Sequence, residues 1–398
     1  MKKTESTAKI VLKSGKDQSL RRYHPWVFSG AIKKMHGNPR EGDVVTVYDN
    51  KDELLAIGHY QDGSIAVRVL EFGNRILPDD FYKLRIRSAW ELRETLGLVN
   101  DEGTNVFRWV CAEGDGMPGL IVDYYNGAVV LQMHSIGMYK RLETIIEAIK
   151  GVAGEKVHTI YNKSGSTLPD KPGIDNRSGF IMGQEPHTEV MENGFRFKVN
   201  WVDGQKTGFF IDQRENRKLV GEWSKGRKVL NMFGYTGGFS VYAMGGGADL
   251  VHSVDSSGRA IDLTDENIRL NFPGDQGHAS FATDAFTYMD EMEQLYDLII
   301  LYPPAFAKHH NVLHNAQQGY KRLNQKAFEK ILPGGILFTF SCSQVMSKEN
   351  FRKSVFAAAA NSGRTVRIIQ QLTQPADHPV SIYHPEGEYL KGLVLHVI

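Results

Sequence analysis

Cys342 is the side chain best suited to covalent chemistry in this sequence of 398 residues. It follows the apolar run GILFTF and lies between Ser341 and Ser343, where a strand is expected to end. A lone cysteine in a strand is usually part of the core. Ligands of α/β sheets bind beyond the carboxyl ends of the strands, however, so this position favours a reactive thiol. Its thiolate could add to carbon 6 of a pyrimidine, which makes carbon 5 nucleophilic.

Glycines and acidic residues follow three other predicted strands. The turn from Phe233 to Gly238, FGYTGG, joins a strand to a helix, and such a turn brings backbone N–H groups close to a ligand. A plain strand–helix connection is the alternative. Asp255 ends the next strand, where an acid binds ribose hydroxyls in nucleotide-binding sheets. Asp284 ends the third, and either accepts a hydrogen bond from an adenine amino group or caps the following helix.

The C-terminal half alternates strands with helices, which predicts a doubly wound α/β sheet. The last two strands are joined by a short polar loop, so we expect an antiparallel pair at one edge, as is typical of class I S-adenosylmethionine-dependent methyltransferases. Just before this sheet, Asp212 is a plausible N-cap of a helix that begins with Gln213 and Arg214. The predicted strands cover residues 229–233, 251–255, 279–284, 296–302, 335–341, 365–372 and 392–398.

The N-terminal part reads as a compact barrel of about five strands, with Trp26 and Phe28 in its core. Residues 1–40 hold ten basic and two acidic side chains, a net charge of 10 − 2 = +8, which favours a phosphate-facing surface; a solvated face is the alternative. Predicted strands cover residues 8–13, 24–32, 43–49, 53–60 and 64–72.

A small α+β unit is expected between the barrel and the C-terminal sheet. Helical patterns at residues 81–97 and 140–151 flank strand signals, and a Gly/Pro/Ser-rich loop is predicted for 163–183. Cys111 lies inside a strand run and is expected to be a buried apolar residue.

Composition indicates an ordinary globular protein of two or three domains. Hydrophobic residues make up 41% of the chain, and no apolar run approaches the ~20 residues of a membrane span. Two cysteines make a disulfide framework unexpected, and the N-terminus lacks the apolar stretch of a signal peptide. We therefore expect a cytoplasmic protein that does not enter a membrane.

Motifs along nearly the whole chain resemble the RlmI-type family of large-subunit (23S) ribosomal RNA cytosine-C5 methyltransferases. The matching motifs are RRYHPWVFSGAI, AEGDGMPGLIVDYY, KTGFFIDQRENR, NMFGYTGGFS, SVDSS, GYKRLN, PGGILFTFSCSQ and PADHPV with HPEGEYLKG. The resemblance implies a PUA-like RNA-binding β-barrel at 1–75, a central α+β domain at 76–192 and a Rossmann-like methyltransferase domain at 193–398.

The family resemblance also implies roles for individual residues and a cofactor, S-adenosylmethionine. Cys342 would attack carbon 6 of cytosine, at a catalytic site completed by Tyr302, Pro303 and Pro304. Large-subunit ribosomal RNA is the expected partner, and a homodimer is left open. The residues expected to bind the cofactor are Gln213, Arg214, Asn231, Phe233, Tyr235, Thr236, Gly237, Gly238, Asp255, Ser256, Asp284 and Ala285. Those expected to bind RNA are Arg21, Arg22, His24, Lys206, Lys308 and Lys321.

Tyr302 departs from the family pattern, in which this strand ends Asp-Pro-Pro. A phenol could donate a hydrogen bond to the target base but cannot supply the charge of an aspartate. Ala305 and Phe306 also stand where some RNA cytosine-C5 methyltransferases carry a second cysteine. An RNA-binding protein with a cofactor pocket and weak or no catalysis is therefore an alternative. A nicotinamide-dependent dehydrogenase and a methyltransferase acting on a base amino group are further ones.

Overall fold

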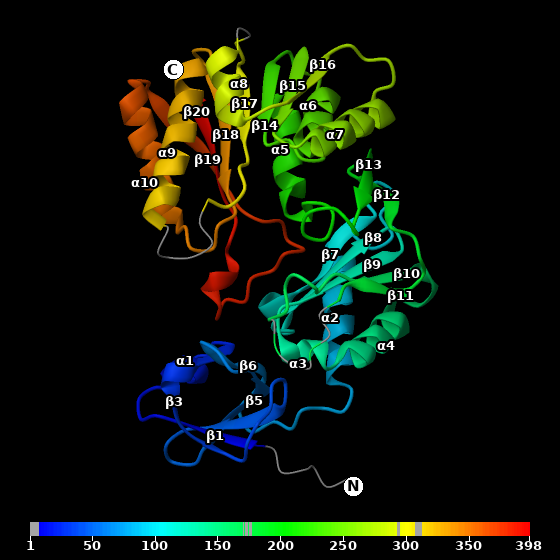
Figure 1. Cartoon of the computed structure of the whole chain (residues 1–398), viewed down its shortest axis with the longest axis vertical. Coiled ribbons are helices and arrows are strands. Elements are labelled where there is room, and N and C mark those ends of the chain that lie inside the picture. The colour runs from blue at the N-terminus through cyan, green and yellow to red at the C-terminus, as the bar shows by residue number, and fades with distance from the viewer. Residues whose placement is uncertain (1–7, 170, 172–173, 175–176, 293–294, 307–312) are drawn as a thin grey trace. The chain divides into compact units, whose positions relative to one another are not determined.

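The computed structural model describes residues 8–169, 171, 174, 177–292, 295–306 and 313–398 (Figure 1). Contacts divide the chain into two units. The first contains Met1–Thr188, Asn200–Gly208 and Ala376–Gly387, and the second contains Glu189–Val199, Phe209–Pro375 and Glu388–Ile398. Two short segments therefore belong to a different unit from their neighbours in sequence. The domain boundaries at residues 75 and 192 stay a prediction.

The N-terminal sheet has six strands in the order β2-β6-β5-β4-β1-β3. The run 24–32, expected to be a single strand, contains β2, a 3-10 turn at Ser29–Ala31 and only the first residue of β3. A short helix, α1 (Gln18–Arg21), precedes them. The strands are β1 (Ala8–Leu12), β2 (Trp26–Phe28), β3 (Ile32–His36), β4 (Val44–Tyr48), β5 (Leu54–Tyr60) and β6 (Ile65–Phe72).

The core prediction for Trp26 and Phe28 was wrong. Val27 is the residue of β2 that faces the core, with 3% of its surface exposed, whereas Phe28 is 45% exposed. Because successive side chains of a strand point to opposite faces, a buried Val27 turns both neighbours outward. Trp26 is half-buried instead, and its indole N–H donates to Glu113 Oε1 at 2.8 Å.

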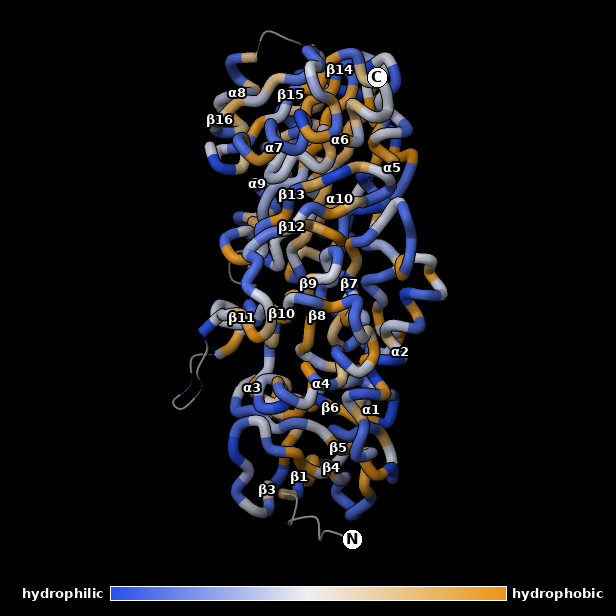
Figure 2. Tube along the Cα trace, turned by 90° about the vertical axis from the view of Figure 1, so that its right-hand side faces the viewer, coloured by the Kyte–Doolittle hydropathy of each residue, from blue (hydrophilic) through white to orange (hydrophobic). Residues whose placement is uncertain are grey.

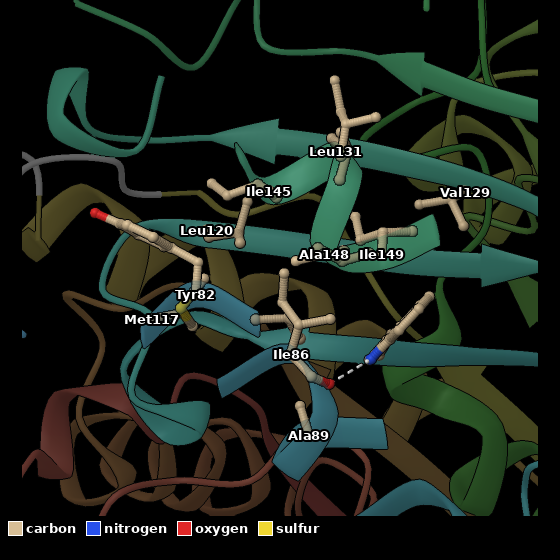
Figure 3. Close-up of a cluster of buried hydrophobic side chains, with 14 of the residues drawn as sticks. Tyr82, Ile86, Ala89, Met117, Leu120, Val129, Leu131, Ile145, Ala148 and Ile149 are labelled. Carbon is tan, nitrogen blue, oxygen red and sulfur yellow. Dashed lines mark hydrogen bonds between the residues drawn. The ribbon is translucent and has the colours of Figure 1, made fainter. Parts of the chain in front are cut away.

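A second sheet in the first unit has the order β11-β10-β9-β8-β7 and packs against helices α2 and α4. Figure 3 shows the core between them, where Ile86 of α2 and Ile145 and Ile149 of α4 surround Leu120 and Leu131 of the sheet. The dashed line at Ile86 is the hydrogen bond that the Trp109 indole donates to its carbonyl oxygen at 3.1 Å. In Figure 2 apolar residues run through the labelled strand β8.

The helices and strands predicted for this region are present, but three further elements, α3, β10 and β11, were not predicted. Strand β11 lies inside the stretch 163–183 predicted as a loop, since a four-residue strand paired only to β10 carries too little pattern to be recognised. The elements are α2 (Phe81–Thr95), β7 (Val106–Cys111), β8 (Leu120–Tyr125), β9 (Ala128–Met133), α3 (Ile136–Tyr139), α4 (Leu142–Ala153), β10 (Thr159–Asn162) and β11 (Gly179–Met182).

The second unit is built on a seven-stranded sheet with the order β16-β15-β14-β17-β18-β20-β19. Strands β14 to β18 pair in parallel, and β20 runs antiparallel to both β18 and β19. The predicted antiparallel ending is confirmed, which argues against the all-parallel dehydrogenase alternative. The strands are β14 (Lys228–Met232), β15 (Leu250–Asp255), β16 (His278–Ala282), β17 (Leu298–Leu301), β18 (Gly335–Ser341), β19 (Val366–Leu372) and β20 (Lys391–Val397).

Helices cover both faces of this sheet (Figure 1). Apolar residues of α5 and α6 pack on one face, and those of α8, α9 and α10 pack on the other. None of the helices in the described ranges combines the length and apolar character needed to cross a membrane. The helices are α5 (Arg214–Trp223), α6 (Gly238–Gly245), α7 (Gly258–Asn271), α8 (Ala285–Glu291), α9 (Leu313–Lys330) and α10 (Lys348–Ser362).

A hairpin of β12 (His187–Glu192) and β13 (Phe195–Asn200) is joined to α5 by a buried ion pair. Arg217 Nε lies 2.8 Å from Glu192 Oε1, and Nη2 lies 2.7 Å from Oε2. Arg217 is 3% exposed and Glu192 is fully buried. Tyr242 of α6 donates a further bond to Glu192 Oε1 at 3.0 Å. Such a bidentate pair fixes the hairpin to the helix with a defined geometry.

Replacement of Glu192 by alanine should lower the stability of α5 strongly, because it leaves the Arg217 charge buried without its carboxylate. Breaking a buried pair in this way costs about 3–5 kcal/mol. The matched control is Glu189→Ala in the same hairpin, which removes an exposed pair with Arg196 (2.5 Å) and should cost less than about 1 kcal/mol. Native-state hydrogen exchange of the α5 amides measures the loss of stability in each variant. Equal losses in Glu192→Ala and Glu189→Ala would contradict the prediction.

Candidate functional site

The site lies where the parallel strands of the second unit end. Parallel neighbours β16, β15, β14, β17 and β18 direct their carboxyl ends to one edge of the sheet. The segments that follow these strands carry Asp284, Asp255, the turn from Phe233 to Gly238, Tyr302 and Cys342 respectively. The structure therefore brings together the residues that the sequence predicted from five separate strand ends, as expected for ligand sites in open α/β sheets.

The turn after β14 has an unusual backbone. Phe233, Tyr235 and Gly237 have positive φ angles of 62°, 48° and 73°, and two of these residues are not glycine. Backbone of this kind is strained and persists only where its surroundings hold it, commonly at ligand sites. Asp255 supplies one restraint, because Oδ2 accepts the Tyr235 N–H at 3.0 Å while Oδ1 accepts the Ser257 N–H at 2.9 Å.

Helix α7 supplies the other restraints on this turn. Thr264 Oγ1 donates to the Tyr235 carbonyl oxygen at 2.9 Å, and Asn267 Nδ2 donates to that of Thr236 at the same distance. A Cβ at Gly237 would lie only 2.7 Å from Thr264 Cγ2, so glycine is needed for this approach. With its carbonyl groups held by α7, the turn presents a preformed backbone at the start of α6.

Polar groups beside the turn fit a ligand with hydroxyl and amino groups. Asn231 is 1% exposed, and its Nδ2 donates to Ser240 Oγ at 2.8 Å, whereas its buried Oδ1 has no hydrogen-bond partner among the described residues. Gln213 is fully buried, and its Oε1 accepts from Asn216 at 2.7 Å. A buried acceptor left open beside a strained turn and an acidic strand end is the environment expected for a nucleoside cofactor.

The remaining predicted cofactor residues are placed as follows. Asp284 caps α8, since its Oδ1 accepts the N–H groups of Phe286 and Thr287 at 2.9 and 3.1 Å. Its contact with an adenine stays a prediction, as does a role for the neighbouring Ala285, which is buried, and for the exposed Ser256. Arg214 is 3% exposed and forms an ion pair with Glu215 at 3.2 Å.

Asp212 does not cap a helix, so that prediction was wrong. It lies in a 3-10 turn, Ile211–Gln213, and α5 begins only at Arg214. Its Oδ2 instead accepts a hydrogen bond from the Tyr389 hydroxyl at 2.7 Å. Its Oδ1 is buried and has no hydrogen-bond partner among the residues described. The carboxylate is thus held within the fold with one oxygen available to a ligand.

Lys391 is a site residue that sequence reasoning missed. It is the first residue of β20, and the antiparallel register places it opposite Ser341, next to Cys342. Its side chain is 4% exposed, and Nζ donates to the Ser343 carbonyl oxygen at 2.7 Å. Burial lowers the pKa of Lys391 to about 8, while interaction with the Cys342 charge acts in the opposite direction. The same interaction favours the Cys342 thiolate, because attraction between two charges is mutual.

Tyr302 lies in an aromatic environment close to Cys342. Its ring centroid is 5.7 Å from those of Phe210 and Phe340. Burial raises the pKa of Tyr302 well above its ordinary value, and the charges of Asp212 and Cys342 raise it further. The phenol therefore keeps its proton at neutral pH and can act as a hydrogen-bond donor. Pro303 is buried beside it and Pro304 is exposed.

The described residues among those predicted to bind RNA are divided between the two units. Arg21, Arg22, His24 and Lys206 belong to the first unit, and Lys321 belongs to the second. Arg21 contacts three carboxylates, those of Asp17, Asp49 and Glu53, at 2.6–2.8 Å, which reduces its charge toward a phosphate. Arg22 and Lys206 are exposed, whereas His24 and Lys321 are half-buried. Lys308 lies outside the described residues.

Comparison with known protein families agrees with this architecture. Residues 130–386 match the family model of the S-adenosylmethionine-dependent methyltransferases, and residues 10–72 match that of the PUA-like domain. Ribosomal RNA large subunit methyltransferase I of Aeromonas salmonicida is 39% identical over 393 residues, covering 97% of this chain and 98% of the relative. The protein of the same name from Alteromonas mediterranea is 38% identical over 397 residues, covering 98% and 99%.

Solved structures share the fold over nearly the full length. A Streptococcus mutans protein assigned to the SAM-dependent methyltransferases superposes with a TM-score of 0.84 at 22% identity, covering 98% of this chain and all of that one. The protein SMU.776, solved in complex with SAH, superposes with a TM-score of 0.85 at 23% identity and the same coverage. The relatives at 38–39% identity, which are named methyltransferases, favour an enzyme over the alternative of a binding protein with little catalysis. The chain belongs to the S-adenosylmethionine-dependent methyltransferases, in the family of the ribosomal RNA large subunit methyltransferase I proteins.

Proposed function

We propose that this enzyme methylates carbon 5 of a cytosine in large-subunit ribosomal RNA. The observation that carries the proposal is the position of Cys342 at the carboxyl end of β18, with the buried Lys391 ammonium and the Tyr302 phenol beside it. Methylation of a base amino group would need no such thiol. The names of the relatives supply the RNA class, and the target base would have to leave its stack to reach the thiol. The cytoplasm, where ribosomal RNA occurs in bacteria, is part of the proposal.

The first chemical task of the site is to activate Cys342. Lys391 favours the thiolate, which adds to carbon 6 of the cytosine and forms a C–S bond. The displaced electron pair makes carbon 5 nucleophilic and places charge on the ring. Tyr302, still protonated, stabilises this charge by donating a hydrogen bond to the ring, the task that an aspartate would perform with a full charge. S-adenosylmethionine, held by the turn after β14, Asp255 and Asn231, supplies the methyl group.

Release of the product requires that the carbon 5 proton leave before the C–S bond breaks. We assign the proton acceptor to Asp212, whose buried Oδ1 has no hydrogen-bond partner in the described part of the chain. The charges of Asp212 and Cys342 both raise the pKa of Tyr302, which supports this assignment. After this proton transfer the electron pair of the C5–H bond restores the ring double bond and expels the Cys342 thiolate. Asp212 must then pass its proton to solvent, after which the enzyme is back in its starting state without the use of a second cysteine.

Cys342→Ala should abolish methyl transfer, because it removes the thiol that forms the adduct at carbon 6. Labelled S-adenosylmethionine, protein-free large-subunit ribosomal RNA and mass spectrometry of the digested nucleosides measure 5-methylcytidine directly. Cys111→Ala is the matched control and should stay active, since burial raises the pKa of Cys111 to about 12 and makes that thiol inert. Undiminished 5-methylcytidine in Cys342→Ala would refute the covalent mechanism.

Lys391→Gln should shift the alkylation of Cys342 to higher pH. Glutamine keeps an N–H donor toward Ser343 but removes the positive charge that favours the thiolate. Loss of an adjacent opposite charge raises a pKa by about 1–3 units. The rate of carboxamidomethylation of Cys342 between neutral and alkaline pH, followed by mass spectrometry, gives the shift. Lys353→Gln, which removes an exposed lysine paired with Glu349 at 2.7 Å, should leave the profile in place. Identical profiles for wild type and Lys391→Gln would exclude this role for Lys391.

Tyr302→Phe should reduce turnover by about 10²-fold, the usual effect of removing one donor to a developing charge. Phenylalanine keeps the ring contacts with Phe210 and Phe340, so binding of the cofactor should be unchanged. Single-turnover methyl transfer and calorimetric titration with S-adenosylhomocysteine separate the two effects. The control is Tyr288→Phe, which removes a half-buried phenol on α8. This phenol is hydrogen-bonded to the Tyr296 hydroxyl at 2.7 Å, and its loss should leave turnover unchanged. Full activity of Tyr302→Phe would show that the hydroxyl takes no part.

A further inference from the structure

Two histidines and a glutamate from opposite ends of the sequence meet in the first unit. His24 follows α1, and His384 and Glu386 lie in the segment Ala376–Gly387, which leaves the C-terminal sheet after β19 and joins the first unit. One donor atom from each of the three residues can be chosen so that all lie within 4.8 Å of one another. His24 was predicted to bind RNA, but the proposed methyl-transfer steps use none of the three residues, so their meeting requires its own explanation.

The distances around the glutamate suit a metal ion. Glu386 Oε1 lies 3.4 Å from His24 Nε2, and Oε2 lies 3.0 Å from His384 Nδ1. Donors bound at about 2.0–2.2 Å to one tetrahedral zinc ion lie about 3.4 Å apart, so both carboxylate–imidazole separations are already near that value. The Glu386 side chain is 47% exposed and can rotate to complete the geometry.

A hydrogen-bonded cluster without a metal explains these contacts less well. The Nδ1 atom of His384 is buried and makes no well-aligned hydrogen bond to any described residue, although a carboxylate oxygen lies 3.0 Å away. A buried ring nitrogen without a well-placed hydrogen-bond partner is costly, and coordination to an ion would satisfy it. Because His384 is only 3% exposed and Glu386 is the open side of the cluster, an ion could enter from the glutamate.

Neighbouring groups fix the orientation of both imidazole rings, as is usual for histidines that bind a metal. His24 Nδ1 faces the backbone of Trp26, 3.3 Å from its carbonyl oxygen and 3.2 Å from its nitrogen, so Nε2 is directed at Glu386. Trp26 also packs against the His384 ring, with centroids 4.3 Å apart, and is itself fixed by Glu113. Outer contacts that orient the ligating rings in this way are a regular feature of protein metal sites.

We infer that His24, His384 and Glu386 form a binding site for a divalent transition-metal ion of the Zn²⁺ class. Two imidazoles and one carboxylate are a donor set that zinc accepts, with the fourth position left to water. The ion would join the segment Ala376–Gly387 to the N-terminal sheet of the same unit. Closing so long a loop should stabilise the folded chain, and the site acts independently of methyl transfer.

The test uses the full chain, stripped with a chelator and titrated with Zn²⁺ by calorimetry, with metal content measured after dialysis. Wild type should bind one equivalent, and its thermal unfolding midpoint should rise with zinc. Glu386→Gln keeps the shape of the side chain, and His384→Phe keeps the ring against Trp26. Each should weaken binding by more than about 100-fold, since loss of an outer contact alone costs 10–100-fold.

Two further variants test whether zinc binds at another place in the chain. Cys342→Ala should bind zinc as wild type does, which excludes the thiol as a ligand. His158→Phe removes a histidine 3.8 Å from Glu185, a surface pair with two donors only, and should also leave binding unchanged. The inference is overturned if wild type retains no zinc after dialysis. It is equally overturned if Glu386→Gln and His384→Phe both retain zinc at the wild-type affinity, because the bound ion would then be adventitious.

Discussion

Parallel pairing is the constraint on which the arrangement of this enzyme's site depends. Five adjacent strands of the second unit run in one direction, so the chain leaves all five at one edge of the sheet. Short segments that are far apart in sequence are thereby collected at one place. Strand β20 is antiparallel to its neighbour β18, so β20 begins at the edge of the sheet where the parallel strands end. Lys391 reaches the site for that reason alone.

A strained backbone at this edge is held by side chains from neighbouring elements. Non-glycine residues with positive φ cost of order 1–3 kcal/mol each, and the turn after β14 contains two of them. Asp255 and α7 bind both the N–H and the carbonyl groups of the turn, which offsets that cost before any ligand arrives. Preorganisation of this kind lets a cofactor bind without ordering the loop, and so more of the contact energy appears as affinity.

Chain order and spatial order differ in two places, and both concern function. The segment Ala376–Gly387 joins the first unit, where buried Arg93 binds the Asp377 carbonyl oxygen at 2.7 Å and Asp115 through both oxygens. Asn200–Gly208 also joins that unit, where Thr207 donates to the buried Asp123 at 2.6 Å. The chain therefore crosses between the two units five times rather than once. Motifs near either end of the sequence meet for this reason, as His24 and His384 do.

The sequence by itself determined the fold class and the alternation of strands with helices in the C-terminal half. It also determined the antiparallel pairing of the last two strands and the residues at the ends of the parallel strands. These follow from local patterns, because apolar runs, glycine turns and strand ends are each encoded within a few neighbouring residues. The family was recognisable for the same reason, since its motifs are contiguous. The departure at Tyr302 was visible as well, because it interrupts one of those motifs.

Only the tertiary structure decided which side chains face one another. The role of Lys391 depends on the register between β18 and β20, which no local pattern encodes, and Asp212 was misjudged because its partner Tyr389 is remote in sequence. Trp26 and Phe28 were misplaced because alternation alone does not say which face of a short strand is buried. Arg21 looked like a phosphate contact until three carboxylates were found around it. Pairing partners, burial and charge environment are properties of the packed chain, so the sequence could name the chemical groups but not their surroundings.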